Sequence, residues 1–291
     1  MYDFDIKSPT TLQEALELKD KYKSKIHPLA GGTDILVLAR NNPGLWGDNP
    51  LLLNLNTIPD LRFINEKKDT MEIGPLVTHT QLAENDSIRT HVPALAQALG
   101  TLGSPQIRNL GTLVGNICHA SPAADSLCIL YTRETSLQIT TIDGERIVKI
   151  SDFITDPGQI SIPENGIVSK VIIPKLPNFK SKFRSLRQRI ALSIVVVSAA
   201  VELLLDEDCI VKDVRIALGA VAPTIVRVPK TEALLRSEKL TDDLIDQVKE
   251  LVPTECVPIT DIRSNKEYRQ AMTGVLVTRL LRELRDEFNK N

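Results

Sequence analysis

The chain has 291 residues, of which 42% are hydrophobic, 25% charged and 4% aromatic, which is typical of a globular protein and excludes a disordered one. At about 150 residues per domain, this length predicts two domains. With 35 Lys and Arg against 37 Asp and Glu, the formal charge is −2, so the chain lacks the positive field that attracts nucleic acid.

No segment predicts export or insertion into a membrane. Residues 1–7 are acidic and contain no apolar core, so no secretory signal is visible. The most apolar stretch, 190–205, contains Glu202 and is shorter than the roughly 20 residues of a membrane helix. Its Ile and Val residues favour a buried strand. The four cysteines are too scattered for a disulfide framework, and we expect a cytoplasmic protein without a membrane span.

The first segment alternates between helix and strand. Thr11-Leu-Gln-Glu14 is a capping-box pattern and predicts a helix that ends near Tyr22. Residues 26–29 and 51–55 are predicted as short buried strands.

The middle of the chain is predicted to be richer in strands. Residues 71–74 give the clearest strand, and helices are expected at 93–102 and after Asp125. Residues 137–142 and 146–150 predict a hairpin, because Asp143-Gly144 between them suits the positive φ angles of a type I′ turn.

A polar segment at 175–182 predicts a domain boundary. Strands at 193–205 and 209–218 are followed by helices at 241–251 and 264–288, which indicates an α+β domain. The last helix carries an apolar stripe from Tyr268 to Phe288, and we interpret it as core packing rather than as a partner surface.

The first candidate binding segment is a glycine loop between a predicted strand and a predicted helix: Leu29, Ala30, Gly31, Gly32, Thr33, Asp34, Ile35 and Leu36. Two adjacent glycines expose backbone amides without a side chain in the way, and a run of such amides binds anions. The residues alone leave two interpretations, a phosphate-binding loop or a tight strand-to-helix turn.

The second candidate segment spans residues 103–125. Small residues, Asn, Thr and Ser dominate it, and only Arg108 and Asp125 carry full charges. Such a lining suits a large cofactor that is partly polar and partly aromatic, because it offers hydrogen bonds without the cost of burying charge. Long loops in compact domains are often functional, and we favour a binding loop over a structural one.

The sequence predicts neither a metal site nor a catalytic side chain. Dinucleotide, P-loop, zinc-protease and hydrolase motifs are absent. Cys118 and Cys128 are ten residues apart without a second pair of ligands, which argues against a metal. His119 is interpreted as a polar lining residue, since no carboxylate or second histidine is evident to orient it.

The order and spacing of several motifs resemble one family. Three motifs resemble those of the FAD-binding subunit of the molybdenum hydroxylases. They are Ala30-Gly-Gly-Thr-Asp34, Ile73-Gly-Pro-Leu-Val-Thr-His-Thr-Gln-Leu82, and Gly103-Ser-Pro-Gln-Ile-Arg-Asn109 with the glycines and Ser121-Pro-Ala-Ala-Asp125 that follow it. Leu218-Gly-Ala-Val-Ala-Pro-Thr224 is similar to a pattern in the C-terminal domain of that family.

The resemblance implies an α+β fold class: a two-subdomain FAD-binding fold of the PCMH type, also called the vanillyl-alcohol-oxidase type, and then an α+β domain like the C-terminal domain of carbon monoxide dehydrogenase flavoprotein. The implied FAD-binding domain covers residues 1–176, with subdomains at about 1–57 and 58–176. The implied C-terminal domain covers 182–291.

The resemblance also implies which residues bind FAD. In this resemblance the pyrophosphate of FAD lies on residues 29–36, and the ribityl chain and ring lie near residues 111–116. Asp125 forms a hydrogen bond toward the adenosine half. The cofactor-binding residues implied outside the first loop are Leu102, Gly111, Thr112, Leu113, Val114, Gly115, Asn116, Ser121, Asp125, Val168 and Arg184.

Two departures from the family pattern affect the implied site. The family commonly has glycine where Val114 stands, and valine would be strained if that position needs a positive φ. Many relatives carry Lys near Ser185, beside Arg184, so either residue is a candidate to face the flavin.

The implied function is electron transfer. Electrons pass from two [2Fe-2S] clusters on a small subunit, through the FAD of this chain, to NAD or another acceptor. A molybdenum–pterin site on a large subunit oxidises the substrate, which we expect to be a purine such as xanthine or hypoxanthine, or another N-heterocycle. The alternatives are a self-sufficient flavin oxidoreductase of the same fold and a scaffold subunit that binds no flavin.

Overall fold

The computed structural model describes residues 4–42, 46, 50–189, 192–288 and 290. The chain forms two compact units, each built from segments that are separate in the sequence. The first unit consists of Met1–Leu82, Pro105–His119 and Thr135–Pro174, and the second of Ala83–Ser104, Ala120–Glu134 and Lys175–Asn291. Two segments of the N-terminal half are thus part of the second unit, and the boundary expected at residues 175–182 stays a prediction.

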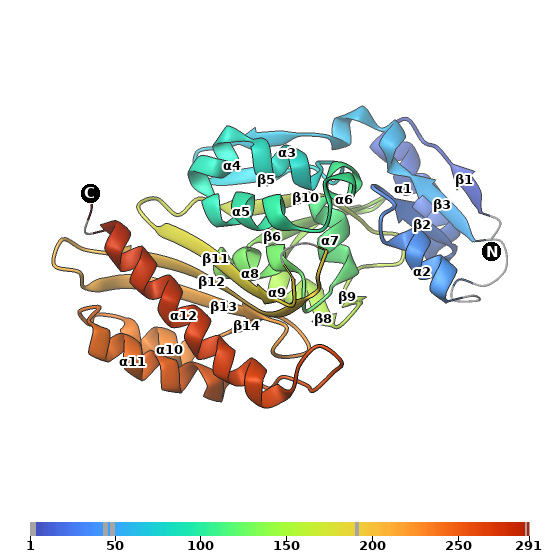
Figure 1. Cartoon of the computed structure of the whole chain (residues 1–291). Coiled ribbons are helices and arrows are strands. Elements are labelled where there is room, and N and C mark those ends of the chain that lie inside the picture. The colour runs from blue at the N-terminus through green and yellow to red at the C-terminus, as the bar shows by residue number, and fades with distance from the viewer. Residues whose placement is uncertain (1–3, 43–45, 47–49, 190–191, 289, 291) are drawn as a thin grey trace. The chain divides into compact units, whose positions relative to one another are not determined.

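The first unit contains three sheets (Figure 1). Its strands are β1 (Asp5–Lys7), β2 (Ile26–Leu29), β3 (Leu51–Asn54), β4 (Ile64–Glu66), β5 (Thr70–Ile73), β6 (Ser136–Thr141), β7 (Gly144–Lys149), β8 (Ile154–Asp156), β9 (Gln159–Ile160) and β10 (Ile167–Pro174). The order β1-β3-β2 forms a parallel sheet, β4-β5-β10-β6-β7 an antiparallel sheet, and β8-β9 a small antiparallel pair.

The helices of the first unit are short and lie between these strands. They are α1 (Leu12–Tyr22), α2 (Ile35–Asn41), α6 (Pro105–Leu110), α7 (Leu113–His119) and α9 (Ile150–Phe153); α3 (His79–Glu84) begins in this unit. The predicted strands at 26–29 and 51–55 and the helix that ends at Tyr22 are confirmed.

The capping pattern explains where α1 begins. The Thr11 hydroxyl accepts a hydrogen bond from the N–H of Glu14 (3.2 Å), so one amide without an intrahelical partner is satisfied. The Glu14 carboxylate in turn accepts from the N–H of Thr10 (2.7 Å), one residue earlier than in a standard capping box. Ala15 and Leu16 of this helix then pack into a buried cluster with residues of β2 and β3.

The predicted hairpin is confirmed, but its turn is one residue earlier than predicted. In the register of β6 and β7, Thr141 faces Gly144, so Ile142 and Asp143 form the two-residue connection. Gly144 has a positive φ of 143°, whereas Asp143 does not have one. The type I′ turn on Asp143-Gly144 is therefore wrong, because the strand register rather than the dipeptide sets the turn.

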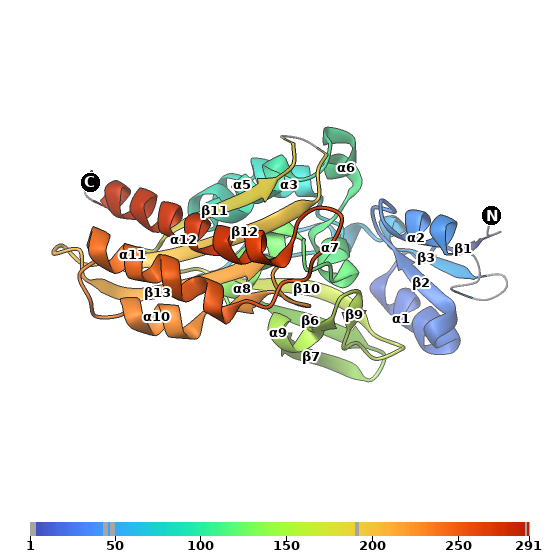
Figure 2. The same ribbon diagram turned by 60° about the horizontal axis from the view of Figure 1, so that its bottom comes forward.

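The second unit is an antiparallel sheet with helices on both faces (Figure 2). The strands, in the order β11-β12-β13-β14, are β11 (Lys180–Arg187), β12 (Val195–Leu205), β13 (Val211–Gly219) and β14 (Val226–Arg227). The helices are α4 (Asp86–His91), α5 (Pro93–Thr101), α8 (Asp125–Thr132), α10 (Pro229–Leu235), α11 (Asp242–Leu251) and α12 (Lys266–Phe288). Helices α10–α12 cover one face, and α5 and α8 the other.

The apolar run at residues 190–205 forms the strand β12, as predicted. Residues 190 and 191 of this run lie outside the described part of the chain. Val197, Ala199 and Val201 face α10–α12 in the main core of this unit. Leu276 and Leu280 of α12 are buried against them, so the apolar stripe of the last helix is core, as interpreted.

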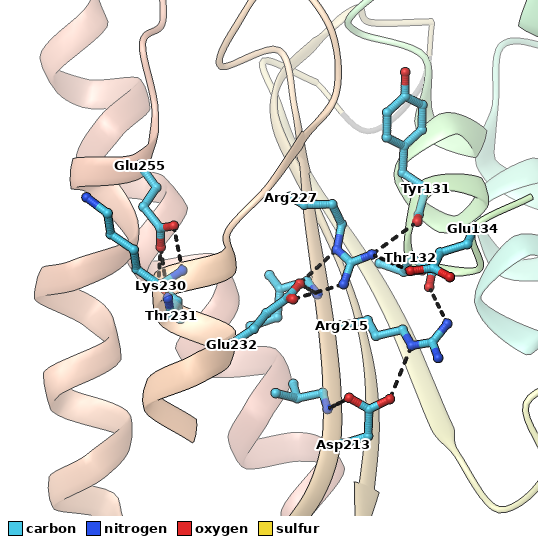
Figure 3. Close-up of polar contacts among 12 residues, drawn as sticks. Tyr131, Thr132, Glu134, Asp213, Arg215, Arg227, Lys230, Thr231, Glu232 and Glu255 are labelled. Carbon is cyan, nitrogen blue, oxygen red and sulfur yellow. Dashed lines mark hydrogen bonds and ion pairs between the residues drawn. The ribbon is translucent and has the colours of Figure 1, made fainter. Parts of the chain in front are cut away.

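Ion pairs tie α10 to the sheet (Figure 3). The Glu232 carboxylate accepts from the Ile216 backbone N–H (2.8 Å) and from the Arg227 guanidinium (2.8 and 2.9 Å). At the start of α10, the Glu255 carboxylate accepts from the N–H (3.0 Å) and the hydroxyl (2.7 Å) of Thr231. These carboxylates satisfy the buried backbone amides of Ile216 and Thr231, and Glu232 also pairs with the half-buried guanidinium of Arg227.

In the ranges that the structure describes, no helix has the length and apolar character needed to cross a membrane.

Candidate flavin-binding site

The first glycine loop connects β2 to α2. Gly32 has a positive φ of 69°, which non-glycine residues rarely adopt. The carbonyl of Ala30 accepts a hydrogen bond from the Asn56 amide (2.7 Å), which fixes the start of the loop. Leu29 ends β2 and is half-buried, whereas Leu36 of α2 is exposed.

The centre of this loop offers unbonded amides. In the part of the chain that the structure describes, no hydrogen bond involves the N–H groups of Gly31, Gly32 or Thr33. Successive free amides that no side chain covers form an anion-binding concavity. The loop therefore has the chemistry that a pyrophosphate requires.

The second loop touches the first at Gly31. A Cβ atom added to Gly31 would lie 2.0 Å from the carbonyl oxygen of Leu110 and 3.0 Å from the Cα of Gly111. Only glycine allows the two backbones to approach this closely. The structure thus brings together two segments that are about 80 residues apart in the sequence and that were predicted to bind one cofactor.

Backbone contacts with α3 hold the second loop. The N–H of His79 donates to the carbonyl of Gly111 (2.9 Å), and Thr78 forms an antiparallel bridge with Thr112. A Cβ on Gly111 would lie 3.1 Å from the His79 ring, so this glycine also has a packing role. Burial lowers the pKa of His79 to about 4, and the ring is neutral at pH 7.

Val114 is not strained, which corrects the expectation from the family pattern. It lies within α7, is 7% exposed and does not have a positive φ. The Thr112 hydroxyl accepts from the N–H of Gly115 (3.1 Å) and its carbonyl from the N–H of Asn116 (3.0 Å), so a normal helical turn starts here. A buried valine in a helix fills core space, and no unusual backbone angle requires glycine.

His119 has a carboxylate partner, contrary to the expectation from the sequence. Its Nδ1 lies 2.8 Å from Oδ2 of Asp34, and both side chains are about 40% exposed. The hydrogen bond to Asp34 raises the pKa of His119, and burial opposes this effect. The pair joins the first glycine loop to the end of α7, so it is a second contact between the two loops.

The remaining predicted residues of the first unit line the loops or support them. Ile35 begins α2 and is half-buried. Leu113 is fully buried and starts α7, which packs on β9 and β10. Val168 is 4% exposed in β10, beside an irregularity in its pairing with β6.

In the second unit, Asp125 begins α8 and is buried. Its Oδ2 accepts from the Arg187 guanidinium, while Oδ1 is buried and has no hydrogen-bond partner among the described residues. Burial raises the pKa of Asp125 to about 6, and the positive charge of Arg187 opposes this. Ser121 lies in the turn before α8, and its hydroxyl accepts from the N–H of Ala123 (3.3 Å).

Sheet alternation separates Arg184 from Ser185. Arg184 pairs with Glu283 of α12, so its side chain lies on the α12 face of the sheet. Ser185 is opposite Ser198 in the register of β11 and β12, and Ser198 contacts Cys128 of α8. Cross-strand partners share a face, so Ser185 lies on the α8 face.

Sequence reasoning missed Arg187. Its guanidinium contacts Asp125 and donates to the carbonyl of Thr101 (3.0 Å) and the hydroxyl of Ser185 (3.0 Å). Arg187 therefore joins α5, α8 and β11. Its contact on α5 is Thr101, the residue before Leu102, which is a predicted site residue. An arginine in a polar strand carries no signal of such a contact, because its partners are distant in the sequence.

Comparisons with known proteins identify the family of this chain. Residues 2–176 match the family model described as the FAD binding domain in molybdopterin dehydrogenase, and residues 181–284 match the CO dehydrogenase flavoprotein C-terminal domain. The Escherichia coli O157:H7 xanthine dehydrogenase FAD-binding subunit is 29% identical over 288 residues, covering 97% of each chain. The glyceraldehyde dehydrogenase medium chain of Sulfolobus acidocaldarius is 26% identical over 97% of this chain and 98% of that one.

A solved structure has the same fold over the whole length. Carbon monoxide dehydrogenase from Hydrogenophaga pseudoflava contains a chain that is 26% identical, with a TM-score of 0.90 over 97% of this chain and 96% of that one. The fold and the glycine loops define an FAD-binding protein. The chain belongs to the family of FAD-binding medium subunits of molybdenum hydroxylases, which confirms the resemblance, the fold class and FAD as the cofactor.

Proposed function

We propose that this chain is the electron-transfer subunit of a molybdenum hydroxylase complex. In this proposal it accepts electrons from the [2Fe-2S] clusters of a small partner subunit and delivers them to NAD or another acceptor, while a large molybdopterin-binding subunit oxidises the substrate. Relatives that match nearly the whole chain are named as medium chains or FAD-binding subunits, which supports a role within a complex.

The contact between the two glycine loops carries this proposal. Gly31 packs on the carbonyl of Leu110, beside three amides that have no hydrogen bond among the described residues. In the proposal, residues 29–36 bind the pyrophosphate and residues 111–116 lie along the flavin half. Bound FAD supplies reversible one- and two-electron chemistry, and the protein holds and orients it.

The substrate is proposed to be a purine or another N-heterocycle. The similarity to a xanthine dehydrogenase FAD-binding subunit supports a purine, and a nicotine 6-hydroxylase medium subunit is also 29% identical. Other relatives are named for glyceraldehyde and carbon monoxide, so the FAD subunit is compatible with large subunits of several specificities.

The two alternatives differ from this proposal in measurable ways. Strain at Val114 would favour a scaffold without flavin, but Val114 adopts ordinary helical geometry. A self-sufficient flavin oxidoreductase would need a substrate proton donor in this chain, and it would turn over substrate without partner subunits.

An absorption spectrum of the purified chain tests the proposal, once alone and once co-purified with its partners. We expect flavin near one per chain in both samples, with iron–sulfur and molybdenum only in the co-purified sample. Xanthine should reduce the flavin only in the complex. A chain that stays colourless after incubation with FAD would refute the flavin role, and substrate turnover by the isolated chain would refute the subunit role.

A further inference from the structure

The contact between Asp34 and His119 bridges 85 residues of sequence and joins the two glycine loops. Asp34 follows directly on Thr33, the last of the three residues with unbonded amides. His119 is the last residue of α7, where a positive charge is favoured by the helix dipole. The pair therefore lies beside the place where a pyrophosphate is proposed to bind.

A carboxylate at this position opposes the binding of an anion. Asp34 places a negative charge next to amides that attract a diphosphate, and charges a few ångströms apart interact appreciably even near water. Protonated His119, with Nδ1 at 2.8 Å, neutralises that charge and holds the carboxylate to one side. Neutral His119 leaves the negative charge of Asp34 uncompensated.

The His119 side chain is accessible to solvent, and its protonation depends on Asp34. Its side chain is 38% exposed, and the hydrogen bond to Asp34 raises its pKa above the ordinary 6.5. A raised pKa means that the interaction is present below this pKa and is lost as the pH rises through it. His119 therefore keeps its positive charge to a higher pH than an ordinary histidine does.

No other described side chain forms an ion pair with His119. Helix α7 packs on β9 and β10 in this unit. Strand β9 has no ionisable residue, and Lys170 of β10 pairs with Glu72 (3.3 Å). Arg108 of α6 acts on His79 rather than on His119.

We infer that His119 is a positioning residue that makes the affinity of the chain for FAD depend on pH. Its protonated ring neutralises Asp34 beside the pyrophosphate loop, so FAD binds more tightly at pH 6 than at pH 9. The inference rests on the proposed function, since it assumes that the diphosphate of FAD binds at residues 29–36.

The test measures the Kd of FAD for the refolded or flavin-stripped chain between pH 6 and pH 9, by quenching of flavin fluorescence. For the wild type we expect the Kd to rise about tenfold over this range, equivalent to about 1.4 kcal/mol. His119→Gln should bind at the weak level throughout. His119→Lys, which keeps its charge at pH 9, should remove most of the loss there.

Asp34→Asn and the double variant complete a cycle. Removal of the carboxylate should give tight binding at every pH, and His119→Gln should then change the Kd less than threefold. His91→Gln is the matched control and should keep the wild-type profile. Melting temperatures of all variants identify any that fail to fold.

Two results would overturn the inference. One is a wild-type pH dependence of the Kd in His119→Gln, and the other is that His119→Gln weakens FAD binding equally in the wild type and in Asp34→Asn. Absence of FAD binding by the wild type at every pH would instead refute the proposed function. The two failures are therefore distinguishable.

Discussion

Substitution of Gly31 by alanine tests whether the two glycine loops must touch. The added Cβ would lie 2.0 Å from the carbonyl oxygen of Leu110, and distances below 3.0 Å do not occur for real Cβ atoms. The backbone of residue 31 fixes the position of the Cβ, and the carbonyl belongs to the backbone of Leu110, so the loops must separate by about 1 Å to reach 3.0 Å. No side-chain rotation relieves this overlap.

Two consequences of Gly31→Ala are expected. Overpacking of this kind costs about 1–3 kcal/mol of folding stability. The unbonded amides of residues 31–33 also move relative to residues 111–116, so the affinity for FAD should fall at least tenfold, or about 1.4 kcal/mol. The loss of affinity should exceed that expected from partial unfolding alone.

The assay compares FAD titrations of the stripped chain with urea unfolding curves. Gly100→Ala is the matched control, because a Cβ there meets no atom within 4 Å and Gly100 lies in α5. In a helix, this replacement should stabilise by up to about 1 kcal/mol and leave the Kd of FAD unchanged. Wild-type FAD affinity in Gly31→Ala would show that the loop contact does not support the cofactor.

Three further substitutions test other parts of the structure. Glu202→Gln should cost about 3–5 kcal/mol in urea unfolding, because it leaves Arg133 buried without its charge partner; a loss below 1 kcal/mol would contradict this. Arg187→Met should destabilise the protein more at pH 8 than at pH 5. Burial raises the pKa of Asp125 to about 6, and an acid whose pKa is raised in the folded state makes stability fall as the pH rises toward that pKa. Loss of the Arg187 charge raises the pKa of Asp125 further, so more stability is lost at the higher pH. Equal losses at both pH values would refute this reasoning. Val114→Gly should lose about 2–4 kcal/mol by thermal or urea unfolding and gain no FAD affinity, since it removes a buried side chain from α7; tighter FAD binding would restore the strain hypothesis.

Short-range patterns in the sequence were sufficient for most of the secondary structure. The Thr11 cap, the alternation in β6 and β7 and the apolar run of β12 each specify an element through neighbours a few residues away. The hairpin turn was displaced by one residue because cross-strand pairing sets the register.

The sequence by itself also determined the family and the cofactor, because the motifs occur in a fixed order and at a fixed spacing over nearly the whole chain. Only the tertiary structure decided which side chains meet. The contacts of Asp34 with His119 and of Asp125 with Arg187 join residues 85 and 62 positions apart. Periodicity reports local geometry, whereas such contacts depend on how distant loops, helices and strands pack.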